Sequence, residues 1–327
     1  MYILKKGKVE KMDCITFSEI GMKENDIEEI LRSNIDIICN DEESMLIVGQ
    51  QVKNEKNGRS DLTAVDNNGN IVLIEIKRDV KDIEIRKEAF EFQAIRYAAS
   101  YATVDNPEDL VKKVYAHYIE KYKNEFELGE LTSYELGIRK LNEFLKVNEA
   151  EKSFNGKQRI ILVASNFDDQ TLSAVAWLNS NHVDMSCFKF TPYRYNEEIY
   201  LNTEKILPVN SYDDFYVSLL EKTSSVVEKK SKSRQALPKI DTMLSWGVVK
   251  PGDIIVAKGR DDEATLLANG NVIVNGEEKS MQSWLKNVYG WSSVQTYANT
   301  IRKESGKTLS QIREEYMEQE AKESSND

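Results

Sequence analysis

Apolar residues recur at helical spacing close to the start of the chain. Ile27 lies three, four and eight positions before Ile30, Leu31 and Ile35, which is the spacing of one face of an α-helix. The pattern therefore predicts an amphipathic helix over residues 25–38.

Three segments with strand character follow this predicted helix. They cover residues 45–52, 60–65 and 71–77, and the polar turn 66–70 separates the second from the third. Turn residues between two apolar runs are typical of neighbouring strands that reverse direction. The order predicts a helix followed by a meander of three strands.

Helical periodicity returns after the third strand. It predicts one long helix from Asp82 to about Val104, because apolar residues repeat at helical spacing and neither Pro nor Gly interrupts them. Residues 107–150, rich in Lys, Glu and Tyr, predict further helices.

A second stretch alternates strand and helix patterns. A strand is predicted at 159–165, a helix at 169–179, and two strands at 185–195 and 198–202. Strands that alternate with helices indicate an α/β layer. We therefore assign residues 1–222 to a single α/β domain.

The rest of the chain changes character twice. Residues 223–236 are polar and basic, which predicts an exposed linker. Residues 237–317 show a helix, short strands broken at glycine turns, and two helices over 280–288 and 308–317, which predicts a small α+β domain able to fold alone. Residues 318–327 form a polar tail.

Composition narrows the classes of protein. A net charge of −11 argues against a protein that coats nucleic acid by bulk electrostatics, although a local basic groove is compatible with it. No apolar run approaches the roughly 20 residues that cross a bilayer, and the first residues lack the apolar centre of a secretory signal. We expect a cytoplasmic protein without a membrane partner.

Histidine and cysteine are scarce. The chain has only two histidines, His117 and His182, so a hydrolase that uses a histidine as its base is poorly supported. The three cysteines, Cys14, Cys39 and Cys187, have no paired spacing and are interpreted as buried small hydrophobic residues. Carboxylate, lysine and metal chemistry therefore remains as the basis for any hydrolytic mechanism.

The third predicted strand carries the acid-x-lysine triplet Glu75-Ile76-Lys77, and Asp61 lies on the strand before it. Glu75 and Lys77 point to one face, whereas Ile76 points to the core and can offer its backbone carbonyl to a metal. Carboxylate oxygens are the ligands that Mg²⁺ prefers, and a lysine can position or deprotonate an attacking water. The pattern predicts a site for phosphodiester hydrolysis.

The triplet by itself is weak evidence. Four other triplets of the same form begin at Asp79, Glu228, Glu277 and Glu320. Only Glu75 follows four apolar strand residues and has an acid on the preceding strand. The alternative is a solvated strand end with an ordinary ion pair, which is common at protein surfaces.

A longer succession of residues resembles a known superfamily. The succession resembles the PD-(D/E)XK phosphodiesterases, particularly their NucS-like branch, and its Gln-x-x-x-Tyr element is similar to that of RecB-like nucleases. Ser60 stands where the superfamily often has proline. The residues that carry the resemblance are Ile27-Glu28, Asn34, Gly58-Arg59-Ser60-Asp61-Leu62, Asp66, Gly69, Val72 to Arg78, and Gln93 with Tyr97.

The resemblance implies a restriction-endonuclease-like mixed sheet flanked by helices. It also implies that Glu28 joins Asp61, Glu75 and the carbonyl of Ile76 around Mg²⁺, for which Mn²⁺ can substitute. Glu29 is the alternative to Glu28, since an error of one residue in the helix phase would exchange them.

Supporting groups are predicted on the helix after the third strand. Gln93 and Tyr97 lie one turn apart and share a face, where they either assist the catalytic strand and the substrate phosphate or pack the helix on the sheet. Arg78, Lys81 and Arg96 are candidates for phosphate contacts, with ordinary surface charges as the alternative.

The C-terminal module resembles the RAMA module, which is associated with restriction enzymes and adenine methylases and is proposed to read modified DNA. Trp284, Trp291 and Tyr297 either stack on a base or form the core of this small domain. The residues that carry the resemblance are Trp246-Gly247, Pro251-Gly252-Asp253, Gly270, Gly276, Ser280, Gly290, Leu309 and Arg313.

Together the two resemblances imply a Mg²⁺-dependent DNA endonuclease with a separate DNA-reading module. Restriction of foreign or modified DNA is the expected role, and a homodimer is expected because cutting both strands uses two active sites. The alternatives are a structure-specific repair nuclease and a non-catalytic DNA-binding protein built on a nuclease scaffold.

Overall fold

A computed structural model describes residues 1–53, 58–84, 88–209 and 237–324 of the chain, and it describes the side chains of these residues except Val80, Glu84 and 321–324. The predicted linker lies outside these ranges. The chain forms two compact units, each with mixed α and β structure; the first comprises Met1–Pro208 with Tyr289–Gln295, and the second comprises Val209–Val288 with Thr296–Asp327.

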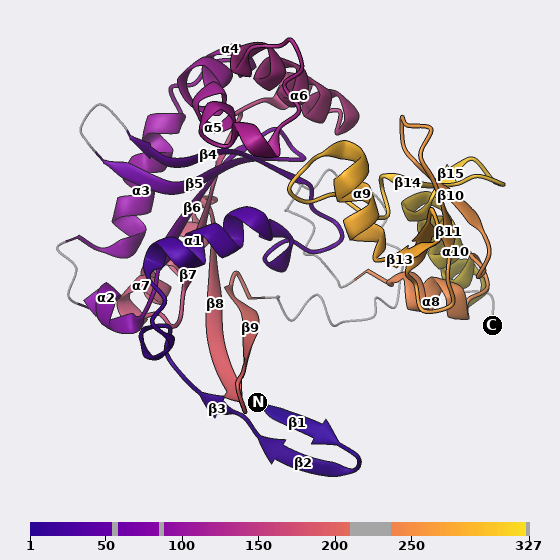
Figure 1. Cartoon of the computed structure of the whole chain (residues 1–327), viewed down its shortest axis with the longest axis horizontal. Helices are drawn as coiled ribbons and strands as arrows, with labels where there is room; N and C mark the ends of the chain where they lie inside the picture. Colours follow the sequence, from indigo (N-terminus) through magenta and orange to yellow (C-terminus); the bar gives the residue numbers. More distant parts are fainter. Residues whose placement is uncertain (54–57, 85–87, 210–236, 325–327) are drawn as a thin grey trace. The chain divides into compact units, whose positions relative to one another are not determined.

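The centre of the first unit is a mixed seven-stranded sheet (Figure 1). Its order is β3-β8-β7-β6-β5-β4, with β9 paired to β8. Strands β4, β5 and β6 form the predicted antiparallel meander, whereas β6, β7 and β8 run parallel. The bounds are β3 Asp13–Cys14, β4 Met45–Lys53, β5 Arg59–Asp66, β6 Ile71–Lys77, β7 Gln158–Ala164, β8 Asp184–Tyr195 and β9 Glu198–Leu207.

Helices flank this sheet, as predicted. Helix α1 packs on β5 and β6, α3 packs on β5, β6 and β7, and α7 packs on β8. The α-helices are α1 Glu24–Ser33, α2 Val80–Glu84, α3 Phe90–Tyr101, α4 Pro107–Leu110, α5 Ala116–Lys121, α6 Ser133–Val147 and α7 Asp169–Ser180. A π-helical turn covers Val111–Tyr115, and 3-10 turns cover Ser18–Ile20, Ile35–Ile37, Lys123–Glu125 and Glu151–Ser153.

Two predicted helices differ from those in the structure. The first ends at Ser33, because the side chain of the following residue, Asn34, donates a hydrogen bond to the carbonyl of Ile30 and thereby competes with a further helical turn. The predicted helix 82–104 is wrong as a single element, because Glu88 and Ala89 are not helical and separate α2 from α3. The apolar pattern did not reveal this break, since buried residues stay in phase on its two sides.

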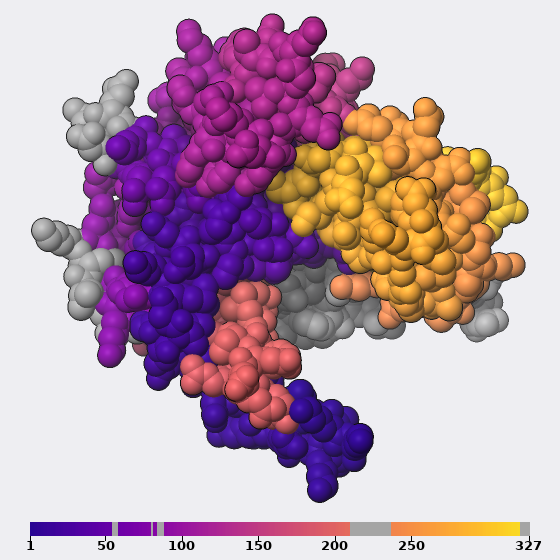
Figure 2. Space-filling model, in the orientation of Figure 1, coloured from indigo at the N-terminus to yellow at the C-terminus, as the bar shows by residue number. Residues whose placement is uncertain are grey.

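A hairpin that the pattern did not predict precedes the sheet. Strands β1 (Tyr2–Lys5) and β2 (Lys8–Lys11) pair antiparallel through a turn in which both Lys6 and Gly7 have positive φ angles, of 46° and 81°. This turn suits the twist of a two-residue hairpin. The hairpin is the indigo projection at the foot of Figure 2, and it exposes Tyr2.

Strand β4 is irregular in its second half. The pairing with β5 shifts between Ile47 and Gly49, and Gln51 then adopts a left-handed backbone with φ of 54°. Gly49 allows β4 to approach the π-helical turn, because a Cβ atom there would lie 2.6 Å from Cγ1 of Val114. The irregular segment, which lies on the edge strand of the sheet, therefore packs closely against the π-helical turn.

The second unit is built on a six-stranded antiparallel sheet of order β13-β12-β11-β10-β14-β15. The last helix, α10, was predicted to end at residue 317 but continues to Ser324. The strands are β10 Ile254–Ala257, β11 Glu263–Leu266, β12 Val272–Val274, β13 Glu277–Lys279, β14 Thr300–Arg302 and β15 Lys307–Thr308; the helices are α8 Ile240–Ser245, α9 Met281–Tyr289 and α10 Leu309–Ser324.

Two further expectations concern solvent and membrane. Cys187 is buried and Cys39 is half-buried, but Cys14 is exposed, so the prediction of a buried residue is wrong there. Cys14 lies on β3, a strand of two residues that are both exposed. Over the ranges that the structure describes, the helices include no segment with the length and apolar character needed to cross a membrane.

Candidate metal-binding and catalytic site

Three polar residues form a row across the antiparallel half of the sheet. In the β4–β5 pairing, Gln50 lies opposite Leu62 and Val52 opposite Ser60, so Gln51 falls opposite Asp61. In the β5–β6 pairing, Leu62 lies opposite Ile74, and the same register brings Asp61 opposite Glu75. Directly opposed residues share one face of a sheet. Gln51, Asp61 and Glu75 therefore lie side by side.

The sheet forks at this row. Backbone pairing between β5 and β6 ends at Leu62 and Ile74, while β6 stays paired with β7 as far as Lys77. On the open side, Oδ2 of Asp61 accepts a hydrogen bond of 2.8 Å from the backbone amide of Ile76. The Asp61 carboxylate thus takes the place of a strand partner, which fixes it beside Glu75.

Helix α1 brings a third acid to the row. Glu28 is 1% exposed, because Ile27 and Leu31 bury the same side of the helix against the sheet. Its Oε2 accepts a hydrogen bond of 3.1 Å from Nε2 of Gln51. The neighbouring Glu29 forms an ion pair of 2.5 Å with Arg32, and its side chain is 47% exposed. Of the two glutamates, Glu28 is the one that the structure brings to the row.

Lys77 lies at the edge of the same site. Its Nζ is 3.0 Å from the carbonyl of Ile76 and 3.2 Å from Oε1 of Glu24, and it lies 5.6 Å from the centre of the Phe90 ring. The carbonyl of Ile76, predicted as a metal ligand, therefore accepts a hydrogen bond from Lys77. Glu24 was not predicted, although its spacing of four residues before Glu28 places both acids on one helix face.

Burial makes the carboxylates of this site unusually weak acids. The pKa of Glu75 is raised to about 9, because desolvation and the nearby Asp61 charge together outweigh the opposing effects of Lys77 and the Asp61 backbone amide. Desolvation likewise raises the pKa of Asp61 to about 7. The pKa of Glu28 is also raised by burial, although Gln51 favours its ionised form.

Several buried oxygens at the site have no hydrogen-bond partner of normal geometry. They are both carboxylate oxygens of Glu75 and Oε1 of Glu28. A buried oxygen left in this way costs about 1–3 kcal/mol, and a shared cation would satisfy several such oxygens at once. Across residues 1–53, 58–84, 88–209 and 237–324, no three acidic, histidine or cysteine side chains are already gathered in a metal-binding arrangement. The donor set fits Mg²⁺, provided that the carboxylates turn toward it.

The predicted pair on α3 lies close to the site but does not bond to its acids. Nε2 of Gln93 donates to the hydroxyl of Tyr97 over 3.4 Å, and the backbone amide of Arg59 donates to the same hydroxyl over 3.1 Å. Tyr97 therefore holds the start of β5. This arrangement corresponds to the packing alternative stated for the pair.

The predicted phosphate contacts are dispersed. Arg96 pairs with Glu88 at 2.5 Å, and Arg78 pairs with both Asp79 and Asp82 at 3.2 Å. Two other cations lie on the same strands as Gln51 and Asp61. Lys53 and Arg59 oppose each other, two residues beyond Gln51 and Asp61, and both are exposed. They went unpredicted because the register of the β4–β5 hairpin cannot be read from the sequence.

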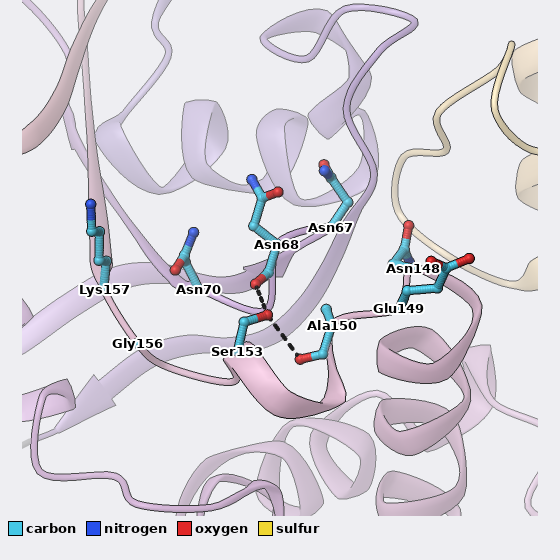
Figure 3. A pocket seen from close by; sticks show the side chains of 9 residues that line it. All are labelled: Asn67, Asn68, Asn70, Asn148, Glu149, Ala150, Ser153, Gly156 and Lys157. Carbon is cyan, nitrogen blue, oxygen red and sulfur yellow. Dashed lines mark hydrogen bonds between the residues drawn. The ribbon is translucent and has the colours of Figure 1, made fainter. Parts of the chain in front are cut away.

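A surface hollow of about 420 Å³ lies at the other end of β5 and β6. It is lined by the β5–β6 turn and by the segment after α6, and Oγ of Ser153 bridges the two by donating to the carbonyls of Asn68 and Ala150 (Figure 3). Four of the nine lining residues are asparagines, and none of the nine is a predicted catalytic residue. The hollow is therefore separate from the site.

The three aromatic residues singled out in the C-terminal module are all buried, but only Trp284 and Tyr297 belong to the second unit. Trp291 lies in the segment Tyr289–Gln295 of the first unit, where its ring packs edge-on against Phe144, so its predicted place in the core of the small domain is wrong. Trp284 and Tyr297 are 3% exposed, and Trp291 is 4% exposed. The Tyr297 hydroxyl accepts a hydrogen bond of 2.9 Å from the amide of Ile240, which ties it to α8. Burial leaves none of the three available to stack on a base without rearrangement.

Comparison with known proteins adds no assignment: no protein-family model matches the chain, and no curated protein matches its sequence.

Proposed function

We propose that this protein is a divalent-metal-dependent DNA endonuclease. The observation that supports the proposal best is that Asp61 and Glu75 lie side by side near Lys77, while both carboxylate oxygens of Glu75 and Oε1 of Glu28 are buried without a hydrogen-bond partner of normal geometry. A buried acid without a partner destabilises the fold, so its presence suggests a functional role such as metal binding. Binding of Mg²⁺ or Mn²⁺ is the use that suits these oxygens.

Each residue has a distinct part in the proposed reaction. Glu28, Asp61 and Glu75 would hold the cation, which supplies charge neutralisation at the phosphate and a lowered pKa for the attacking water. Lys77 would orient that water or stabilise the developing negative charge from the end of β6. Glu24, whose carboxylate pairs with Lys77 at 3.2 Å, would release it when the substrate arrives.

Charges near the site fit a phosphate backbone. Lys53 and Arg59 are exposed and directly opposed across β4 and β5, an arrangement in which like charges repel each other. A DNA strand would relieve that repulsion and would lead from this cationic pair toward Asp61. A local basic feature of this kind is compatible with the overall charge of −11.

The second unit would select the target, in line with its resemblance to the RAMA module. Cutting and selection would then reside in different parts of the chain, because metal chemistry on the backbone does not read sequence. We propose restriction of foreign or modified DNA as the biological role, with two copies of the chain acting on the two strands.

The test is cleavage of supercoiled and linear DNA, with and without base modification, in Mg²⁺, Mn²⁺ or EDTA. Glu75→Gln should abolish cleavage. Glu277→Gln is a matched control, because Glu277 begins another acid-x-lysine triplet and is 73% exposed. DNA binding without any metal-dependent cutting would support the non-catalytic alternative, and equal cutting of modified and unmodified DNA would support a repair nuclease.

A further inference from the structure

The backbone of Gln51 has an unusual conformation at the proposed site. Its φ of 54° lies in the left-handed region, which glycine and asparagine tolerate but a longer side chain adopts at an energetic cost. The residue stands inside strand β4, where extended backbone is the rule. Such strain persists only where the surrounding structure imposes it, and it often accompanies function.

The side chain of Gln51 explains what the strain accomplishes. Its Nε2 donates to Oε2 of Glu28 at 3.1 Å and to Oδ1 of Asn25 at 3.3 Å, so the carboxamide bridges two residues of α1. Gln51 also occupies the row position opposite Asp61. The same residue thus links the helix that carries one acid to the strand that carries another.

Only one oxygen of Glu28 is engaged in this way. Oε2 accepts the hydrogen bond from Gln51, whereas Oε1 is buried without a partner. A ligand carboxylate held by one oxygen keeps its orientation and offers the other oxygen to a cation. Groups that orient metal ligands in this manner typically change metal affinity by about 10–100-fold when they are removed.

We propose that Gln51 is a positioning residue that uses a strained backbone to hold Glu28 in place for a divalent cation. The inference rests on the proposed function, since it concerns the same site. It assigns to β4 a part in the metal site that the acids on α1, β5 and β6 do not supply.

The decisive variant is Gln51→Gly, because glycine relieves the strain and removes the carboxamide together. We expect its thermal midpoint in EDTA to equal or exceed that of the wild type, while calorimetry shows Mn²⁺ binding weakened by about 10–100-fold. A residue with only a structural role would not separate the two measurements in opposite directions. Unchanged Mn²⁺ affinity in Gln51→Gly would overturn the inference.

Lys6→Gly is the matched control, because Lys6 is a long side chain with φ of 46° in the β1–β2 turn, remote from the row. It should gain similar stability and keep the wild-type Mn²⁺ affinity. A Lys6→Gly variant that also lost Mn²⁺ affinity would show that the effect at Gln51 is not local.

A double-mutant cycle with Glu28→Gln shows whether Gln51 acts through Glu28. In the Glu28→Gln background, Gln51→Gly should cause little further loss of Mn²⁺ affinity, because the residue that it positions is already altered. Additive losses would overturn the positioning role. Failure of the wild type to bind Mn²⁺ at all would instead refute the proposed metal site, so the two failures are distinguishable.

Discussion

Glu75→Gln should stabilise the metal-free protein at pH 8 while it abolishes cleavage. Burial raises the pKa of Glu75 from 4.5 to about 9, so the folded protein retains a proton that the unfolded chain loses. The stability that depends on this proton is fully present below pH 4.5 and is lost progressively as the pH rises toward 9. Glutamine imitates the protonated acid and avoids the loss.

The size of the effect follows from proton linkage. One additional bound proton changes the free energy of unfolding by about 1.4 kcal/mol per pH unit, or about 3 kcal/mol between pH 6 and pH 8. For a unit of roughly 200 residues, each 1 kcal/mol corresponds to about 2–4 °C in melting temperature. The contribution of Glu75 alone should therefore lower the melting temperature of the wild type in EDTA by roughly 6–12 °C between pH 6 and pH 8, and Asp61, whose pKa burial raises to about 7, adds to this fall.

The assay is thermal unfolding of both proteins in EDTA from pH 5 to pH 8.5. The Glu75→Gln curve should lie above the wild-type curve at pH 8 and converge with it near pH 5. Mg²⁺ should raise the wild-type midpoint and leave that of the variant almost unchanged, since binding stabilises only the state that binds. A wild-type midpoint that does not fall between pH 6 and pH 8 would refute the reasoning.

Glu29→Gln serves as the control for this experiment. The hydrogen bonds from Arg32 lower the pKa of Glu29, so its contribution is present above pH 4.5 and is constant between pH 6 and pH 8. The variant should be slightly less stable at all these pH values, with a wild-type slope. A changed slope in Glu29→Gln would mean that the pH dependence does not originate at the buried acids.

Three further changes test other parts of the structure. Lys77→Met should reduce cleavage by about 100-fold or more. Calorimetry should show Mn²⁺ affinity retained or increased, because a cation next to the metal is removed. Loss of both cleavage and Mn²⁺ affinity would contradict separate roles for Lys77 and the metal ligands. Gly49→Ala should lower stability in urea by about 1–3 kcal/mol, because its Cβ would lie 2.6 Å from Val114; unchanged stability would contradict that close approach. Trp284→Ala should cost about 3–5 kcal/mol, considerably more than Trp246→Ala, and similar melting curves for the two variants would contradict a core position for Trp284.

Periodicity predicted the general architecture well. A mixed α/β fold with helices flanking a sheet was predicted and is confirmed. The three strands of the meander were predictable because their apolar runs end at strong turn residues, above all at 66–70. The break between α2 and α3 was not predictable, because Ile83 and Phe90 are seven residues apart and both buried, as they would be in one continuous helix.

The candidate site was predictable only in part. Asp61, Glu75 and Lys77 could be selected because strand alternation determines which side chains share a face. Gln51 could not, since glutamine has no preference for the left-handed region, and only the distorted strand imposes that conformation. Glu24 was missed because the predicted helix began one residue too late to include it.

The hydrogen bond between Asp61 and the Ile76 amide makes the site observable without any substrate. On the open side of the fork, this amide is held by a carboxylate rather than by a neighbouring strand. The exchange of its hydrogen with deuterium therefore follows the engagement of one side chain and not the opening of the whole sheet. A cation that draws Asp61 away would accelerate exchange at Ile76 while the amides paired with β7 become slower, so a single spectrum could show both the binding event and the strand that responds to it.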